Sequence, residues 1–497
     1  MRLSKEYGDF QTPEKLAKEI AVIVNSSLPK IDAIIEPTCG TGSFIKAFTE
    51  IKTSAKKVIG WEINSQYVEI AKQHISRIDE SLSISIKQQN FFDVEWSQIK
   101  CEANNSLFIG NPPWVTNSEL GKYLSGNLPQ KINFQNLSGL EAMTGKSNFD
   151  ISEWILIKIC QQISCTTSAM AFLVKTSVAR KIYQYIANNK LSISSIQIRE
   201  IDAKKHFGVN VDACLFVAKG SKTSINQYVC DIYTSLHSST PQRTIGLHGG
   251  KLISDINTYT KLADIDSGCE LKWRSGVKHD ASKIMEFNIT DQGLTNGLGE
   301  IVNISDNYLY PMYKSSDIAQ PVLNPPRKKM LVTQQKIGED TKVIKDISPD
   351  TWNYLTINSD KLDSRKSSIY KNAPRFAIFG VGDYTFRPWK IVISSLYKNI
   401  KFYKIGCFDN KPIILDDTCY MLGFDSEAEA DLILTVLTSE IASKFIDSII
   451  FKDNKRAVTA TILNRISLRP IAVRLGVDES FDSLFSKDKD KQLLLRT

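Results

Sequence analysis

The stretch IDAIIEPTCGTGSF, residues 31–44, decides the fold of the N-terminal half of this chain. An apolar, strand-like run at residues 31–35 leads directly into a turn with glycines at positions 40 and 42, and a helical pattern follows. Glycine lets the backbone turn tightly and approach a ligand without interference from a Cβ atom. In open α/β sheets, ligands bind at such turns, beyond the carboxyl ends of the strands. The stretch therefore predicts a strand, a ligand-binding turn and a helix in succession.

Strand-like and helix-like patterns alternate from this stretch up to residue 220. A helix is expected from Thr12-Pro13, with Thr12 as N-cap and Pro13 at the first helical position. Further helical spacing occurs at residues 66–76 and 152–163. The strand-like runs are residues 31–35, 57–61, 82–87, 107–109, 169–174, 193–198 and 213–217. This alternation predicts an α/β fold, a doubly wound Rossmann-like domain with helices on both faces of a mainly parallel sheet.

The pattern changes after residue 220 to Ser/Thr-rich stretches and short strands broken by turn residues. We expect a domain boundary within residues 220–250, which divides the chain into domains 1–235 and 236–497. A helix is expected over residues 426–450, after a capping box formed by Ser426 and Glu429. The second domain is therefore predicted to be mixed α+β with a C-terminal helical segment.

Composition narrows the function classes. The chain has 497 residues, 42% of them hydrophobic, and a net charge of +8. It contains no run of about 18 apolar residues and no apolar N-terminal signal, so we expect a soluble, cytoplasmic protein without membrane contact. The nine cysteines are scattered without metal-ligand spacing, so they are expected to be reduced thiols, and no metal is predicted. The mild positive charge fits a polyanionic partner without identifying one.

Two carboxylates near the glycine turn indicate the ligand. Glu62 ends the next strand-like run, twenty residues after Gly42, where a carboxylate can accept hydrogen bonds from ribose hydroxyls. The loop has neither the third glycine of a dinucleotide site nor the G-K-[ST] of a triphosphate site. Glu36, at the end of the first strand, would repel phosphate. These features favour a cationic adenosine ligand without phosphate, such as S-adenosylmethionine.

The stretch IGNPPW, residues 109–114, ends the fourth strand-like run of this series. Proline fixes φ and has no N–H, so the two prolines hold Asn111 and the carbonyl of Pro112 in one conformation. The two oxygens can accept both N–H bonds of an exocyclic amine on a nucleobase, which frees the nitrogen lone pair to attack a methyl group. Trp114 is expected to stack on this base, a contact worth about 1–3 kcal/mol. A base inside a duplex must be flipped out to reach such a site.

These motifs resemble those of the N6-adenine DNA methyltransferases of bacterial restriction-modification systems, in the gamma order. The resemblance covers residues 7–220, with GDFQTP at 8–13, EPTCGTGSF at 36–44, NPPW at 111–114, NFD at 148–150 and HFGV at 206–209. It implies transfer of a methyl group from S-adenosylmethionine to N6 of adenine in double-stranded DNA. It also implies that the second domain recognises the target sequence, and it leaves open whether a cognate restriction endonuclease acts on the same site.

The resemblance, together with the residue patterns above, assigns site residues. The expected catalytic residues are Asn111, Pro112, Trp114 and Phe207, with Phe207 stacking on the other face of the flipped base. The expected cofactor-binding residues are Thr12, Glu36, Thr38, Gly40, Gly42, Glu62, Ile63, Asn90, Phe91 and Asn111. The chain departs from the family after the third strand, where the family usually has an acidic residue beside a Phe. Either Asn90 or Asp93 is expected to contact the cofactor adenine there.

Several alternatives remain open at this stage. Cytosine offers the same kind of amine, so N4-cytosine methylation is the nearest rival, followed by methylation of RNA or of a protein glutamine. A non-catalytic DNA-binding subunit with the same fold is a rival from another class. A fused nuclease is not expected, because the cofactor motif begins at residue 8. The segment FGVGDYTF at 379–386, with Lys390 nearby, is interpreted either as a DNA contact or as a tight turn in a sheet.

Overall fold

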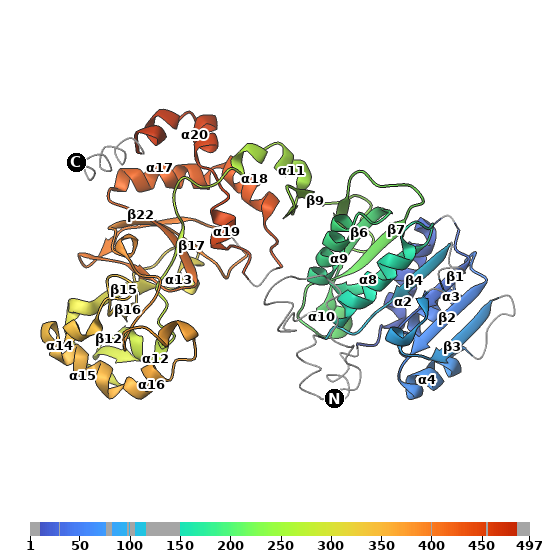
Figure 1. The fold of residues 1–497 in the computed structure, drawn as a ribbon, viewed down its shortest axis with the longest axis horizontal. Helices are drawn as coiled ribbons and strands as arrows, with labels where there is room; N and C mark the ends of the chain where they lie inside the picture. The colour runs from blue at the N-terminus through green and yellow to red at the C-terminus, as the bar shows by residue number, and fades with distance from the viewer. Residues whose placement is uncertain are drawn as a thin grey trace. The chain divides into compact units, whose positions relative to one another are not determined.

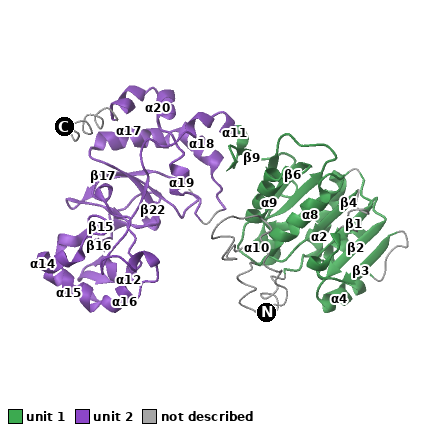
Figure 2. Ribbon diagram, in the orientation of Figure 1, with its two compact units in different colours: residues 1–257 green, residues 258–497 purple. Residues whose placement is uncertain are grey.

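The chain divides into two compact units in a computed structural model that describes residues 10–28, 30–75, 82–96, 99, 105–115, 150–398, 400–453 and 456–484. The units are residues 1–257 and 258–497 (Figure 2). The division therefore falls after residue 257, later than the boundary expected after residue 235. The reason is that three strands within residues 229–253 pair onto the edge of the first sheet and so belong to the first unit.

The first unit is built around one ten-stranded sheet (Figure 1). Its strands are β1 (Ala33–Glu36), β2 (Lys57–Glu62), β3 (Ser83–Gln88), β4 (Ser106–Gly110), β5 (Ala169–Lys175), β6 (Ile193–Ile201), β7 (Ala213–Gly220), β8 (Val229–Tyr233), β9 (Arg243–His248) and β10 (Lys251–Ile253). Their order across the sheet is β3-β2-β1-β4-β5-β7-β6-β8-β9-β10. Strands β1 to β5 pair in parallel, whereas β7 runs antiparallel to both β5 and β6. Every strand-like run expected from the sequence is confirmed.

Helices cover both faces of this sheet. They are α2 (Glu14–Ser27), α3 (Ser43–Thr49), α4 (Ser65–Ile75), α8 (Ile151–Ile163), α9 (Thr176–Asn188), α10 (Ala203–Phe207) and, at the unit boundary, α11 (Ile256–Thr260). All five residues of β4 are buried, as expected for a central parallel strand that is covered on both sides. The doubly wound arrangement predicted from the sequence is therefore confirmed.

The first helix begins one residue later than expected. Its first bond runs from the backbone N–H of Ala17 to the carbonyl of Pro13, so Pro13 is the N-cap and no side chain caps the helix. Thr12 is not the cap; its side chain is buried at the edge of a pocket instead. The residue that the sequence assigns to helix capping is thus available for ligand contact.

The strand order places the site. The sheet is built outward in opposite directions from the neighbours β1 and β4, which pair in parallel. Ligands in open α/β sheets bind at such a reversal, in the crevice beyond the carboxyl ends of the strands. Glu36 is the last residue of β1, and Asn111 directly follows β4. The two motifs singled out in the sequence therefore meet at this point of the sheet.

The second unit contains mainly antiparallel strands in three small sheets. The strands are β11 (Arg274–Ser275), β12 (Glu286–Thr290), β13 (Gly293–Asn296), β14 (Ile301–Val302), β15 (Leu309–Tyr313), β16 (Lys328–Leu331), β17 (Trp389–Ser394), β18 (Tyr403–Ile405), β19 (Cys407–Phe408), β20 (Lys411–Pro412), β21 (Ile414–Leu415) and β22 (Cys419–Phe424). The sheet orders are β14-β13-β12-β16-β15-β21, β11-β22-β17-β18 and β19-β20.

Helices complete this mixed α+β unit. They are α12 (Ser282–Met285), α13 (Ser315–Ile318), α14 (Ile344–Ile347), α15 (Pro349–Ile357), α16 (Ser359–Asp363), α17 (Glu427–Thr438), α18 (Glu440–Ile449), α19 (Ala460–Leu463) and α20 (Arg469–Leu475). The Ser426 cap is confirmed, since its hydroxyl accepts from the backbone N–H of Glu429. The single helix expected over residues 426–450 is wrong, because Ser439 interrupts it and caps α18 by accepting from the N–H of Ala442.

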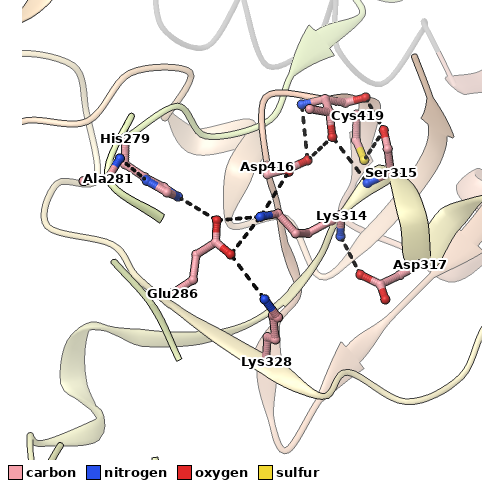
Figure 3. Close-up of polar contacts among 10 residues, drawn as sticks. His279, Ala281, Glu286, Lys314, Ser315, Asp317, Lys328, Asp416 and Cys419 are labelled. Carbon is pink, nitrogen blue, oxygen red and sulfur yellow. Dashed lines mark hydrogen bonds and ion pairs between the residues drawn. The ribbon is translucent and has the colours of Figure 1, made fainter. Parts of the chain in front are cut away.

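A network of ion pairs surrounds the buried carboxylate of Glu286 in the six-stranded sheet of the second unit (Figure 3). Lys314, after β15, donates to both carboxylate oxygens of Glu286 at 2.7 and 2.8 Å. His279 and Lys328 lie 3.5 and 3.6 Å from the same carboxylate. Lys314 also lies 4.0 Å from Asp416, which directly follows β21 of the same sheet. Although burial raises the pKa of Glu286, the bonds from His279 and Lys314 outweigh it and lower this pKa to about 2. The network therefore clamps strands β12, β15 and β16 to the segment that follows β21.

The segment at residues 379–386 is a packed turn rather than an exposed loop. Gly380 has a φ of +69°, and a Cβ atom there would lie 2.3 Å from the carbonyl oxygen of Gly276. Lys390 is fully buried, and its ammonium donates to the carbonyl of Arg387 at 2.7 Å. Burial lowers the pKa of Lys390 to about 7. Because Lys390 is fully buried in strand β17, its side chain cannot contact DNA in this arrangement. For Lys390, the structural interpretation is therefore favoured over a DNA contact.

Candidate functional site

A pocket opens beyond the carboxyl ends of β1 to β4. The N-terminal segment before α2 closes one side of it, and the start of α8 closes another. The lining residues are Phe10, Gln11, Thr12, Glu36, Pro37, Thr38, Cys39, Gly40, Ser43, Glu62, Ile63, Asn64, Gln66, Tyr67, Gln89, Asn90, Phe91, Phe92, Asn111, Pro113, Val115, Ile151 and Ile155. Nearly all of the expected cofactor-binding residues lie in this one hollow. It joins the glycine turn to Asn111.

The glycine turn has the backbone conformation that its sequence predicts. Gly40 and Gly42 have φ values of +51° and +84°, in the left-handed region that favours glycine. A Cβ atom on Gly40 would lie 2.5 Å from the side-chain oxygen of Gln11. Gly42 does not line the pocket, and a Cβ atom there would meet Ala71 of α4 at 3.1 Å. Gly40 thus brings the backbone to the pocket, whereas Gly42 allows the turn and the packing behind it.

Two carboxylates make one wall of the pocket electronegative. Glu62 accepts from the backbone N–H groups of Gly40 and Asn64 at 2.8 and 2.9 Å, which ties β2 to the glycine turn. Glu36 is 3% exposed. Burial raises the pKa of Glu36 well above its ordinary value; a backbone bond from Ile45 opposes this rise, and the negative charge of Glu62 adds to it. A cationic ligand would relieve the cost of ionising Glu36, so this wall suits positive charge.

The segment after β3 supplies another wall of the pocket. Asn90 precedes a single 3-10 turn, η1 (Phe91–Asp93), and its side-chain oxygen accepts from the backbone N–H of Phe92 at 3.1 Å. Asn90 and Phe91 line the pocket. Asp93 is exposed and is not among the lining residues. Of the two candidates left open by the sequence, Asn90 is therefore the one placed to meet a ligand.

The loop after β4 fixes the amide of Asn111. The Asn111 Nδ2 group donates to the carbonyl of Phe10 at 2.7 Å, while Oδ1 is buried without a partner. Pro113 lines the pocket, and Pro112 is buried beside it. The two consecutive prolines have fixed φ angles, which leave this loop little conformational freedom. The amide thus presents an acceptor, and not a donor, toward the ligand.

Two contacts from outside the motif hold the same loop. Lys175, at the end of β5, donates to the carbonyl of Trp114 at 3.0 Å and to the carboxylate of Asp150 at 2.8 Å. The backbone N–H of Ile151 donates to the carbonyl of Val115 at 3.0 Å. Asp150 also caps α8 by accepting from the N–H of Ser152. The loop is therefore anchored on β5 and α8 as well as on β4.

Three buried oxygens in the pocket lack hydrogen-bond partners: Glu36 Oε2, Thr38 Oγ1 and Asn111 Oδ1. A buried polar atom left unpaired costs about 1–3 kcal/mol, and native structures contain few of them. Their gathering in one hollow indicates a place for a polar ligand. The residues present therefore fit a cationic, hydrogen-bonding group between β1 and β4.

The aromatic residues expected to hold a base are arranged differently from the prediction. Trp114 is 4% exposed, packs in the hydrophobic core and donates from its indole N–H to the carbonyl of Leu173 at 3.1 Å. Its ring meets that of Phe207 edge to face, with centroids 5.2 Å apart, and Phe10 packs against both rings. Neither Trp114 nor Phe207 lines the pocket. No slot for a base lies between them in this conformation, so their stacking roles stay predictions that require the rings to part.

Some residues that matter here were not singled out from the sequence. Gln11 lies within the GDFQTP motif, which pointed to the right segment but not to this side chain. Lys175 carries no local signal, because its contacts are with residues distant in the sequence. Of the motifs at 8–13 and 148–150, residues 8, 9, 148 and 149 lie outside the described residues.

The described residues meet neither the requirements of a metal site nor those of a membrane-spanning helix. No cluster of three or more His, Cys, Asp or Glu side chains suited to a metal ion occurs among the residues that the structure describes. Within the same ranges, no helix is both long enough and apolar enough to cross a membrane.

Comparison with known proteins places the chain among DNA-modifying enzymes. The sequence profile of the N-6 DNA methylase family matches residues 2–198. The Type II methyltransferase M.NspV from Nostoc sp. is 46% identical over 470 residues, which cover 94% of this chain and 97% of that protein. Among solved structures, the Type IIL restriction-modification enzyme MmeI in complex with DNA matches 91% of this chain with a TM-score of 0.51 and 13% identity. This chain spans 64% of the MmeI chain, and at that identity the likeness concerns the fold alone.

Proposed function

Because the chain belongs to the N-6 DNA methylase family, we propose that it transfers a methyl group from S-adenosylmethionine to N6 of adenine in double-stranded DNA. The observation that carries this proposal is the buried, unpartnered Oδ1 of Asn111, which shares a pocket with the electronegative end of β1. An acceptor beside a cation-binding wall is what the methylation of an amine requires.

We infer that the residues lining the pocket hold the cofactor. Glu62 would accept from the ribose hydroxyls, since each carboxylate oxygen can accept a second bond besides the one from the backbone. Ile63, Asn90 and Phe91 would surround the adenine, and Thr12, Glu36, Thr38 and Gly40 would meet the methionine end. S-adenosylmethionine, when bound, supplies an electrophilic methyl group on a sulfonium. The raised pKa of Glu36 and its unpartnered oxygen support a cation at this end.

The role of Asn111 follows from the chemistry of the target amine. The lone pair of an exocyclic amine is delocalised into the base, so the nitrogen is a poor nucleophile. Asn111 Oδ1 and the carbonyl of Pro112 would accept its two N–H bonds and draw the nitrogen toward tetrahedral geometry. The fixed prolines and the bond to Phe10 hold the acceptor in place beforehand, so little reorganisation is needed during reaction.

Access of a base to this site requires the aromatic cluster to open. A base reaches Asn111 only after it leaves the duplex. The rings of Phe10, Trp114 and Phe207 now contact one another beside the NPPW loop. We propose that the flipped base separates Trp114 from Phe207 and stacks between them, exchanging aromatic contacts within the protein for contacts with the base.

We propose that the second unit, residues 258–497, recognises the DNA target. The 46% identity to a Type II methyltransferase extends over 94% of the chain and so includes this unit. The fold similarity to MmeI, which was solved in complex with DNA, also covers 91% of the chain. The enzyme would then be the modification part of a restriction-modification system, and a cognate endonuclease for the same site would be its biological partner.

The experiment that tests this proposal measures both the reaction and the base. The purified full-length chain is incubated with S-adenosylmethionine and genomic DNA from a methylation-deficient strain, and the nucleosides are then analysed by mass spectrometry. We expect N6-methyladenine. Appearance of N4-methylcytosine would support the nearest rival instead, because cytosine offers the same kind of amine. Absence of any methylated base would support a non-catalytic DNA-binding subunit.

A further inference from the structure

The orientation of the Asn111 amide depends on a contact outside its own loop. A side-chain amide carries an acceptor at one end and donors at the other, and a rotation of 180° exchanges them. Here the carbonyl of Phe10 accepts from Nδ2 at 2.7 Å, so Oδ1 is directed to the other side, where it is buried and without a partner. The opposite orientation would present an NH2 group to the target amine, whose own N–H groups it cannot accept.

The carbonyl of Phe10 is itself held by the next residue. Residues 10–12 belong to no helix or strand, so no backbone ladder fixes this peptide. The side-chain oxygen of Gln11 accepts from both the backbone N–H and the hydroxyl of Thr41, each at 3.0 Å. The same side chain lies against Gly40, where a Cβ atom would come within 2.5 Å of the Gln11 side-chain oxygen. The position of the Phe10–Gln11 peptide therefore follows the position of the glycine turn.

We propose that Gln11 is a positioning residue that couples the glycine turn to the catalytic amide. The chain of contacts runs from Thr41 to Gln11, through the adjoining carbonyl of Phe10, to Nδ2 of Asn111. Gln11 thereby keeps the acceptor of Asn111 turned to the target amine once the cofactor occupies the turn. This inference rests on the proposed methyl transfer and adds a residue to it.

The consequence is a loss in rate that exceeds any loss in cofactor affinity. Gln11 is exposed, so its replacement opens no cavity in the core. Without the bonds to Thr41, the Phe10 carbonyl can move, and the Asn111 amide can rotate. Misplacement of a catalytic group by about 1 Å can cost a factor of about 100 in rate. We expect a loss of about tenfold or more in the methyl-transfer step, because partial orientation by the prolines remains.

The test compares full-length wild type with Gln11→Met, Gln11→Glu and Gln11→Ala. Methionine keeps the length of the side chain without its acceptor, and glutamate keeps the acceptor. The control is Gln161→Met, at an exposed glutamine of α8 whose amide donates to the hydroxyl of Tyr185. Single-turnover methylation of DNA is measured at saturating S-adenosylmethionine, and the cofactor Kd is measured separately by calorimetry without DNA.

The expected result is a drop in rate of about tenfold or more for Gln11→Met and Gln11→Ala, with the cofactor Kd changed by less than about threefold, and recovery of most of the rate in Gln11→Glu. A wild-type rate in Gln11→Met would overturn the inference alone. So would a rise in Kd that accounts for the whole loss, since Gln11 would then serve cofactor binding. If the wild-type chain itself does not methylate DNA, the proposed function fails first, and this inference fails with it.

Discussion

Two buried carboxylates, one in each unit, differ in a way that separates a site from a structural clamp. Glu36 is 3% exposed and has an oxygen without a partner, whereas Glu286 is 6% exposed and is surrounded by Lys314, Lys328 and His279 (Figure 3). Burial raises the pKa of Glu36, but at Glu286 the surrounding donors outweigh burial and lower the pKa to about 2. The protein supplies the counter-charge itself at Glu286. At Glu36 we propose that a cationic ligand supplies it.

The largest expected effect is a loss of stability when the charge of Glu286 is removed. Glu286→Gln leaves the partly exposed Lys314 and Lys328 beside a neutral group, and loss of the partner of a charged group that water still reaches costs about 1–3 kcal/mol. The free energy of unfolding, measured with denaturant, should fall by this amount. Glu440→Gln, at an exposed helical pair with Lys444, is the control and should leave stability unchanged. An equally stable Glu286→Gln variant would show that the network is not a clamp.

The sign of the pH dependence at Glu286 follows from its lowered pKa. Its folded pKa, about 2, lies below the ordinary value of 4.5, so the folded protein binds this proton less tightly than the unfolded chain. The stability that Glu286 contributes is therefore present above pH 4.5 and is lost as the pH falls toward 2. Acid denaturation of wild type and Glu286→Gln should converge over this range. Parallel curves would contradict the pairing.

At Glu36, the pH dependence of stability should have the opposite sign. Because the folded pKa of Glu36 is raised, the folded protein favours the protonated form, and stability falls as the pH rises from 4.5 through that pKa. Glu36→Gln should therefore be at least as stable as wild type at neutral pH without cofactor. It should bind S-adenosylmethionine about tenfold more weakly or worse, which corresponds to about 1.4 kcal/mol. Calorimetry and thermal unfolding check the two halves; a destabilised variant with unchanged affinity would make Glu36 structural.

The smallest effect is a change in protonation. A cation placed beside Glu36 favours its ionised form, so binding of S-adenosylmethionine should release part of a proton from the wild type near the raised pKa. Binding heats measured in two buffers with different ionisation enthalpies report this release. Glu36→Gln should show none of it. Equal proton release from both proteins would assign the titration to another group.

The parts of the site that the sequence could predict depend on local backbone chemistry. The conformations of Gly40 and Gly42 and the caps of short turns are set within a few residues, and the alternation of strands and helices set the sheet. Glu36 and Asn111 stand at the carboxyl ends of the neighbouring parallel strands β1 and β4, and such ends lie at one edge of a sheet.

The parts that could not be predicted depend on tertiary contacts. An aromatic residue after Asn-Pro-Pro gives the same local sequence pattern whether its ring faces a bound base or the core. In the structure, the hydrogen bond to the carbonyl of Leu173 and packing in the core fix the position of Trp114. Gln11 and Lys175 act on residues 30 and 61 positions away. Likewise, the boundary at residue 257 depends on strands that pair onto an edge which the sequence does not define.

The central claim is that the unpartnered oxygen of Asn111 accepts from the amine that is methylated. Its most direct test is Asn111→Ala, measured for single-turnover methylation of DNA and for S-adenosylmethionine affinity in the same preparation. We expect methylation to fall by a factor of at least about 100, as for loss of a preorganised group that acts in the transition state, with the cofactor Kd changed only a few-fold. Methylation at the wild-type rate in this variant would contradict the account.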